Sequence, residues 1–103
     1  MQFKLFMEDK EKTFSVPFVK GRLFRKALKM NKVFNEGGEI TEEVTDQLVD
    51  FVCEVFNSQF TPDDVWDGMP LDGILPALQG VFFEVIDRGT KSIQGGTDTS
   101  KND

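Results

Sequence analysis

Residues 41–66 read TEEVTDQLVDFVCEVFNSQFTPDDVW, and this stretch decides the fold. Thr41 is a suitable N-cap, and the two acids after it suit the positive end of a helix. Apolar side chains then recur at three- and four-residue spacing, which predicts an amphipathic helix that ends at Asn57-Ser58. These side chains are Val44, Leu48, Phe51, Val52 and Val55, with Phe56 beside them. We expect this helix at the centre of the core, with Cys53 as a small core or boundary residue.

A second helix start follows at Thr61-Pro62-Asp63-Asp64, where Thr is the cap, Pro occupies the first position and an acid lies three residues after the cap. This helix carries Trp66 and must be short, because Gly68 and Pro70 follow.

The last predicted helix has Asp72 as a candidate cap and Pro76 in its first turns, where a missing N–H is tolerated. Its expected core stripe is Leu71, Leu75, Leu78, Phe82 and Ile86, with Ile74, Val81 and Val85 adjoining. Arg88-Gly89 suits a C-terminus. The polar residues 90–103 are expected to be a disordered tail.

Upstream of the central helix, residues 21–34 form a predicted basic amphipathic helix with an apolar stripe. The stripe is Leu23, Ala27, Met30 and Phe34. Residues 35–39 read as a loop. Before this helix, apolar and polar residues alternate over 2–7 and 13–18, on either side of charged residues 8–12, which predicts an antiparallel β-hairpin with Pro17 at its end.

These elements predict a mostly α fold of the α+β kind, with an N-terminal β-hairpin packed on a small bundle of about four helices. The chain has 103 residues, which suits one domain, and we assign the globular part to residues 1–89.

The net charge of −6 conceals two charged regions. Residues 1–34 carry nine Lys or Arg against three acids, and residues 35–89 carry one Arg against thirteen acids. The simplest interpretation is attraction between the two regions within one fold; head-to-tail association between copies is an alternative. Nucleic-acid binding is not expected, because the acidic region would repel phosphate.

The composition argues against an enzyme. The chain has no His and no Tyr, and Cys53 is its only Cys, which excludes a Ser-His-Asp triad, an intramolecular disulfide and a Cys-rich zinc site. Asp63, Asp64 and Asp67 do not have the spacing of a calcium loop, so capping explains them better. We expect no catalytic residue, no cofactor and no metal. The N-terminus lacks a signal-peptide pattern, no apolar run would span a membrane, and the lone Cys favours the cytoplasm.

Eleven Phe and one Trp exceed what the predicted core stripes need. The aromatic residues off those stripes are Phe6, Phe18, Phe60, Trp66 and Phe83. Either the short elements bury them, which we expect first for Phe60 and Trp66, or they form an adaptable apolar surface together with Met residues. The residues we select for a partner-binding surface are Phe6, Phe18, Met30, Trp66 and Met69.

Three stretches resemble the small tail assembly chaperones of long-tailed, siphovirus-type phages and prophages of Gram-positive bacteria. The first is residues 12–28 (KTFSVPFVKGRLFRKAL). The second is residues 49–56 (VDFVCEVF) followed by residues 59–68 (QFTPDDVWDG), and the third is residues 74–79 (ILPALQ) leading to residues 84–86 (EVI). Their shared features are packing and capping patterns, not catalytic signatures.

The resemblance implies a non-catalytic protein that binds the helical tape measure protein and helps to recruit tail tube subunits. It also implies action in the host bacterial cytoplasm, absence from the finished virion and, in many members, an extension made by a programmed frameshift. Ser100-Lys101-Asn102 can be encoded by a slippery heptamer, so we predict the slip site near Lys101.

Two other functions stay open at this point. A small DNA-binding or regulatory module would use the basic helix 22–32, with Arg25 and Lys29 as contacts. A structural tail-completion protein would remain in the particle. The sequence alone does not decide between these functions, nor does it give the oligomeric state.

Overall fold

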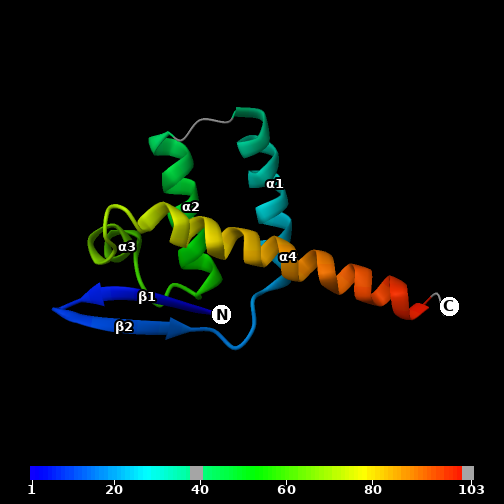
Figure 1. Cartoon of the computed structure of the whole chain (residues 1–103), viewed down its shortest axis with the longest axis horizontal. Coiled ribbons are helices and arrows are strands. Elements are labelled where there is room, and N and C mark those ends of the chain that lie inside the picture. Colours follow the sequence, from blue (N-terminus) through cyan, green and yellow to red (C-terminus); the bar gives the residue numbers. More distant parts are fainter. Residues whose placement is uncertain (38–40, 101–103) are drawn as a thin grey trace.

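The computed structural model describes the backbone of residues 1–37 and 41–100 and the side chains of residues 1–32 and 41–91. Two antiparallel strands, β1 (Gln2–Met7) and β2 (Lys10–Ser15), are followed by four helices. The helices are α1 (Gly21–Gly37), α2 (Glu42–Val55), α3 (Pro62–Gly68) and α4 (Ile74–Ser100) (Figure 1). The predicted hairpin on a mostly helical body is confirmed.

Helix α2 occupies the centre of the structure and contacts α1, α3 and α4. Thr41 caps it as predicted, since its Oγ1 accepts a hydrogen bond from the Val44 N–H at 3.1 Å. Phe51 and Phe56 are fully buried, and Phe51 meets Phe82 of α4 edge to face at 5.7 Å between ring centroids. The helix ends where Asn57 and Ser58 take positive φ angles, as the sequence predicted.

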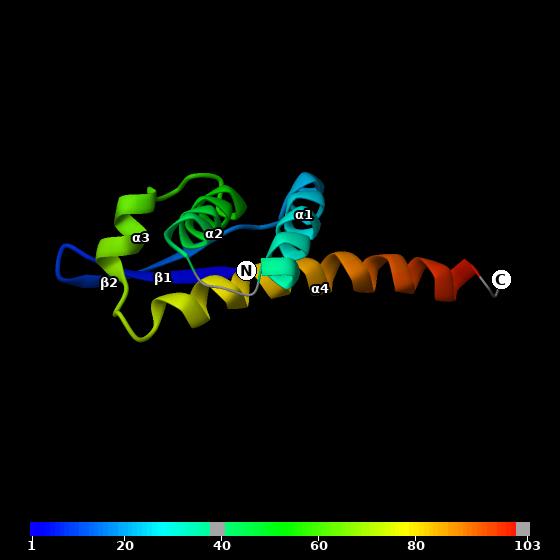
Figure 2. The ribbon, with the colours of Figure 1, turned by 90° about the horizontal axis from the view of Figure 1, so that it is seen from above.

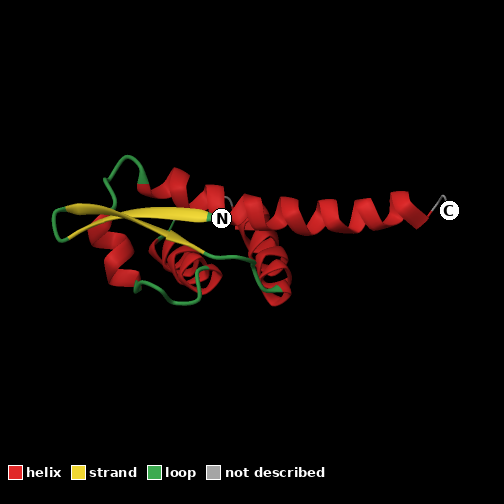
Figure 3. Cartoon of the chain, turned by 90° about the horizontal axis from the view of Figure 1, so that it is seen from below, coloured by secondary structure: helices red, strands yellow, loops and turns green. Residues whose placement is uncertain are grey.

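The hairpin lies beside the helices at one end of the molecule (Figure 3). Phe3 pairs with Phe14 and Leu5 with Lys12, so one face of the hairpin turns toward the helices. Its turn is tighter than the charged stretch suggested: only Glu8 and Asp9 connect the strands, both with positive φ.

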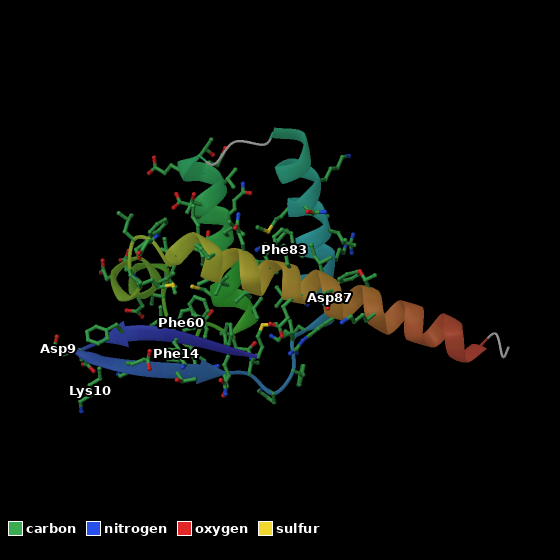
Figure 4. The ribbon with its side chains drawn as sticks, in the orientation of Figure 1. Asp9, Lys10, Phe14, Phe60, Phe83 and Asp87 are labelled. Atoms are coloured by element: carbon green, nitrogen blue, oxygen red, sulfur yellow. The ribbon has the colours of Figure 1, made fainter. Side chains whose placement is uncertain are left out.

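Phe60 joins the hairpin to the body. It lies in the connection from α2 to α3, is 3% exposed, and packs its ring 4.9 Å from that of Phe14 and 5.5 Å from that of Phe3 (Figure 4). The prediction of a buried staple is therefore confirmed for Phe60. The side-chain amide of Gln59 adds a hydrogen bond of 2.8 Å to the carbonyl of Ser15.

Helix α4 lies across α1 and α2, and its last turns project past α1 (Figures 1 and 2). The predicted helix end at Arg88-Gly89 is wrong, because the helix continues to Ser100. Gly89 is not a C-cap here. A Cβ on it would lie 2.6 Å from Cγ of Phe24, so it is the residue that lets α1 approach α4.

The buried stripe of α4 is also rotated from the predicted one. Leu71 precedes the helix and is 94% exposed, while Leu75 and Ile86 are only partly buried. The buried residues are Ile74, Leu78, Val81, Phe82 and Val85. The spacing of Leu71, Leu75 and Leu78 favoured the neighbouring face, whereas the packing of α4 against both α1 and α2 buries Ile74 and Val85.

Other predictions concern the loops and the tail. Asn35, Glu36 and Gly37 belong to α1 and not to a loop. The rest of that loop, the side chain of Phe34 and the slip site at Lys101 lie outside the described residues. Disorder of residues 90–103 in solution stays a prediction.

Candidate protein-docking surface

Three of the five residues selected from the sequence are exposed aromatic side chains: Phe6 is 57% exposed, Phe18 67% and Trp66 40%. Met69 is partly buried against the core. Burying these rings against a partner would remove large apolar surfaces from water, which is the main source of affinity in most protein interfaces.

Met30 is not part of any exposed surface, and its selection is corrected here. It is 7% exposed and packs in the core with Leu23 and Ala27 of the same helix. Met30 was selected because a flexible Met side chain suits an adaptable surface. Its spacing in the apolar stripe of α1, however, places it on the buried face of the helix.

Phe6 borders a groove of about 570 Å³, which we call the Phe6 groove. Phe6 points outward because Phe3 and Leu5, at alternate positions of β1, point into the core. The remaining lining comes from the other strand, from α3 and from the turn after α3. The full lining is Lys4, Leu5, Phe6, Glu11, Asp67, Gly68, Met69 and Pro70, so Phe6 and Met69 share one groove.

Gly68 makes this arrangement possible. A Cβ at this position would lie 3.0 Å from the carbonyl oxygen of Phe6 and 3.3 Å from Cβ of Leu5. Real Cβ atoms seldom come so near to backbone, so the glycine allows the end of α3 to rest directly on β1. From the sequence Gly68 is predicted only to end a short helix, because its contact with β1 depends on a strand more than 60 residues earlier in the chain.

Phe18 borders a second groove of about 290 Å³, which we call the Phe18 groove. It lies between the connection from β2 to α1, the first turns of α1 and the middle of α4. Its lining is Pro17, Phe18, Val19, Lys20, Gly21, Phe24, Val85, Arg88 and Gly89. Gly89 contributes through its missing side chain, since the ring of Phe24 occupies the space beside it.

Trp66 is exposed on α3, and the prediction that it is a buried staple is wrong. The predicted capping box is present in both directions: Asp64 N–H donates to Thr61 Oγ1 at 3.2 Å, and Thr61 N–H donates to Asp64 Oδ2 at 2.9 Å. This start fixes the rotation of the helix so that Val65 and Gly68 face inward. Trp66, one position after Val65, must then face outward.

Three further apolar side chains outside the five selected ones are exposed, and one of them, Phe83, is among the aromatic residues off the predicted core stripes. They are Leu28, Leu71 and Phe83, at 46%, 94% and 54% exposure. Phe83 follows the buried Phe82 and stands above α4 in Figure 4. Val81 and Phe82 face the core on one side of α4, and the next position, about 100° further around the helix, turns the ring of Phe83 toward solvent.

One ion pair among the described side chains joins the basic N-terminal region to the acidic body, between Lys26 of α1 and Glu54 of α2. It supports the interpretation of attraction within the fold. The other described pairs are local, such as Arg88 with Glu84 at 2.6 Å. Exposed cations on or next to α1 are Lys20, Arg22, Arg25, Lys29 and Lys32.

The described residues hold no cluster of three or more His, Cys, Asp or Glu side chains that is placed to bind a metal ion. Nor does any helix of the described part have the length and apolarity needed to cross a membrane.

Cys53 is buried in α2, as predicted, and its thiol is unsuited to nucleophilic chemistry. Its pKa is raised from 9.0 to about 11, mainly by the loss of solvation on burial and to a smaller extent by the negative charges of Asp50 and Asp64. The thiolate, which is the reactive form, is therefore disfavoured at neutral pH.

We expect Cys53 to react with an aromatic disulfide reagent at pH 8 only after unfolding. The folded state holds the thiol proton more tightly than the unfolded state, so stability is unaffected below pH 9 and falls between pH 9 and about pH 11. Over that range the loss should reach about 2 to 3 kcal/mol. Urea titrations of wild type and Cys53→Ala measure it. Equal pH slopes for the two proteins would contradict the assignment.

The chain matches, over residues 1–102, a family model described as phage tail chaperone protein. Searches of curated proteins and of solved structures returned no significant match.

Proposed function

The chain belongs to the phage tail chaperone family, and from that premise we propose that it binds the tape measure protein and helps to recruit tail tube subunits around it. The family match covers nearly the whole chain, so the role in tail assembly concerns the entire domain and not one segment of it. The two named clients are our proposal.

The observation that carries the proposal is the exposure of Phe6, Phe18 and Trp66 on a small domain with a well-filled core. Exposed rings of this size are suitable contact points for a partner, because covering them removes a large apolar surface from water. A tape measure protein is a long helical protein, and its apolar helix faces need cover until the tube encloses them. The chaperone would supply that cover with its aromatic side chains.

The two grooves belong to different elements. The Phe6 groove lies where the hairpin meets α3, and the Phe18 groove lies where α1 meets α4. A client that entered both would contact most of the fold, and partly buried Met69 would adapt to irregular client side chains.

The rest of the proposal concerns the biological setting. We propose a siphovirus-type phage or prophage of a Gram-positive host, action in the host cytoplasm, no enzymatic activity and absence from the virion. We also propose a frameshifted form. Its slip site near Lys101 would add the extension after the projecting end of α4, and codons there that cannot form a slippery heptamer would contradict this site.

Co-expression with the tape measure protein of the same phage tests the function. We expect wild type to keep the tape measure protein in the soluble fraction and to copurify with it. The triple variant Phe6→Ser/Phe18→Ser/Trp66→Ser should lose both effects while it retains the helical circular dichroism of wild type, because these side chains are exposed.

The matched control is the double variant Leu28→Ser/Leu71→Ser, which removes exposed apolar side chains outside the two grooves. It should preserve the soluble complex. Full activity of the triple variant would refute the aromatic surface, and failure of wild type to solubilise any tail protein would refute the proposed function.

One observation favours a second candidate, the exposed cations of α1, among them Arg25 and Lys29. Retention on duplex DNA at physiological salt would support it. Lys26 is already paired with Glu54, and the remaining body is strongly acidic, which disfavours phosphate.

A further inference from the structure

We propose that the Phe18 groove receives a bulky apolar side chain from an acidic amphipathic helix of the partner. This inference rests on the proposed function and specifies the chemistry of the client segment. Nothing in the family match assigns a ligand to this groove.

The lining of the groove selects an apolar anchor. Phe18, Val19, Phe24 and Val85 present carbon atoms to it, and its floor lies at the crossing of α1 and α4, where Gly89 has no side chain. Phe18 itself is 67% exposed, so an entering side chain would cover one face of its ring.

The charges at the groove select an acidic partner. Lys20 and Arg88 belong to its lining, and none of its lining residues is a carboxylate. Arg88 forms an ion pair with Glu84. Lys20 is exposed, and Arg22 follows it at the start of α1. The first turn of α1 contains no acid, so the positive end of its dipole adds to the attraction.

The walls of the groove select a helix over an extended strand. Its lining comes from α1, from α4 and from the short connection before α1. None of the lining residues belongs to a strand, so an extended partner would find no sheet edge to extend there. An amphipathic helix, by contrast, places an apolar residue in the groove and carboxylates three or four positions away toward the cations.

Nucleic acid fits the same surface less well. Glu54 and Glu84 lie among the cations of α1 and α4, and an apolar groove gives a phosphate backbone nothing to bind. A partner helix can place its few carboxylates away from Glu54 and Glu84, whereas a nucleic-acid backbone carries a phosphate at every nucleotide and would be repelled by both.

Photo-crosslinking from the groove tests the inference with the full chain and a soluble tape measure fragment. The photoreactive residue p-benzoylphenylalanine replaces Phe18, and mass spectrometry identifies the captured segment. We expect a helical segment of net negative charge with a bulky apolar residue at the captured site. The same photoreactive residue in place of Leu71 is the control and should capture that segment far less.

Charge reversal supplies the second readout. Lys20→Glu should weaken binding of the fragment several-fold and Phe18→Ser about tenfold or more. Lys10→Glu changes the net charge equally at the tip of the hairpin, away from the groove, and should leave the affinity unchanged (Figure 4).

The outcomes separate this inference from the proposed function. The inference fails, and the proposed function stands, if the fragment binds but the captured segment is basic or neutral, if nothing is captured, or if Lys20→Glu binds like wild type. Binding of a 20-base-pair duplex in preference to the fragment, lost in Lys20→Glu, would also overturn it. If wild type binds no tail protein at all, the proposed function itself fails.

Discussion

Replacing Phe60 with Ala should lower the free energy of unfolding by about 3 to 5 kcal/mol, the usual cost of removing a buried ring. Phe60 is 3% exposed, and its ring lies 5.7 Å from that of Phe56, in addition to the contacts with Phe3 and Phe14. A cavity there would separate the hairpin from α2 as well as remove apolar contacts. Urea denaturation measures the loss.

The matched control is Phe18→Ala, which removes the same ring from a site that is 67% exposed. It should change stability by no more than about 0.5 kcal/mol. Amide exchange adds a local readout, since β1 should exchange faster in Phe60→Ala than in Phe18→Ala. A loss below about 1 kcal/mol for Phe60→Ala would show that the aromatic cluster does not hold the hairpin.

Substitution of Gly89 should have the second large effect. Gly89→Ala places a methyl group 2.6 Å from Cγ of Phe24 and closer still to two other ring carbons. Either the ring leaves its site or α1 and α4 separate, so we expect a loss of about 1 to 3 kcal/mol despite the better helix propensity of Ala. Thermal unfolding followed by circular dichroism measures it.

Gly80 provides the internal comparison, because it lies in the same helix and a Cβ there meets no described atom within 4 Å. Gly80→Ala should raise stability by about 0.5 to 1 kcal/mol through helix propensity alone. Opposite signs for the two glycines would establish Gly89 as the contact point of α1 and α4. Stabilisation by both substitutions would contradict the close packing.

Local sequence patterns predicted much of the fold. The three- and four-residue spacing of apolar side chains in α2, the alternation in β1 and the capping box at Thr61 each act within a few residues of chain. Such signals depend on geometry that a helix or strand imposes by itself, and no distant contact is needed to interpret them.

The parts that could not be predicted depend on distant contacts. Gly89 looks like a helix end until Phe24, 65 positions earlier, is seen beside it. The buried face of α4 could not be chosen from its own residues, because it has apolar side chains on two adjoining faces and the contacts with α1 and α2 decide which face is buried.

In the candidate docking surface, too, some residue positions follow from local patterns and others depend on distant contacts. The outward position of Phe6 follows from strand alternation. Met30 was wrongly selected for the surface, although its place in the apolar stripe of α1 already indicated burial. Burial was predicted for both Phe60 and Trp66, and only Phe60 is buried, because α3 rests on β1 with Gly68 and Val65 facing inward and so turns Trp66 outward. The rotation of that short helix is a tertiary property, and it decides which aromatic ring is available to a partner.

The central claim is that the exposed aromatic side chains bind a tail protein, and titration calorimetry with a soluble tape measure fragment tests it most directly. We predict that wild type binds the fragment and that Phe6→Ser/Phe18→Ser/Trp66→Ser, folded like wild type, binds at least about 30-fold more weakly. A dissociation constant for the triple variant within about threefold of the wild-type value would contradict the account.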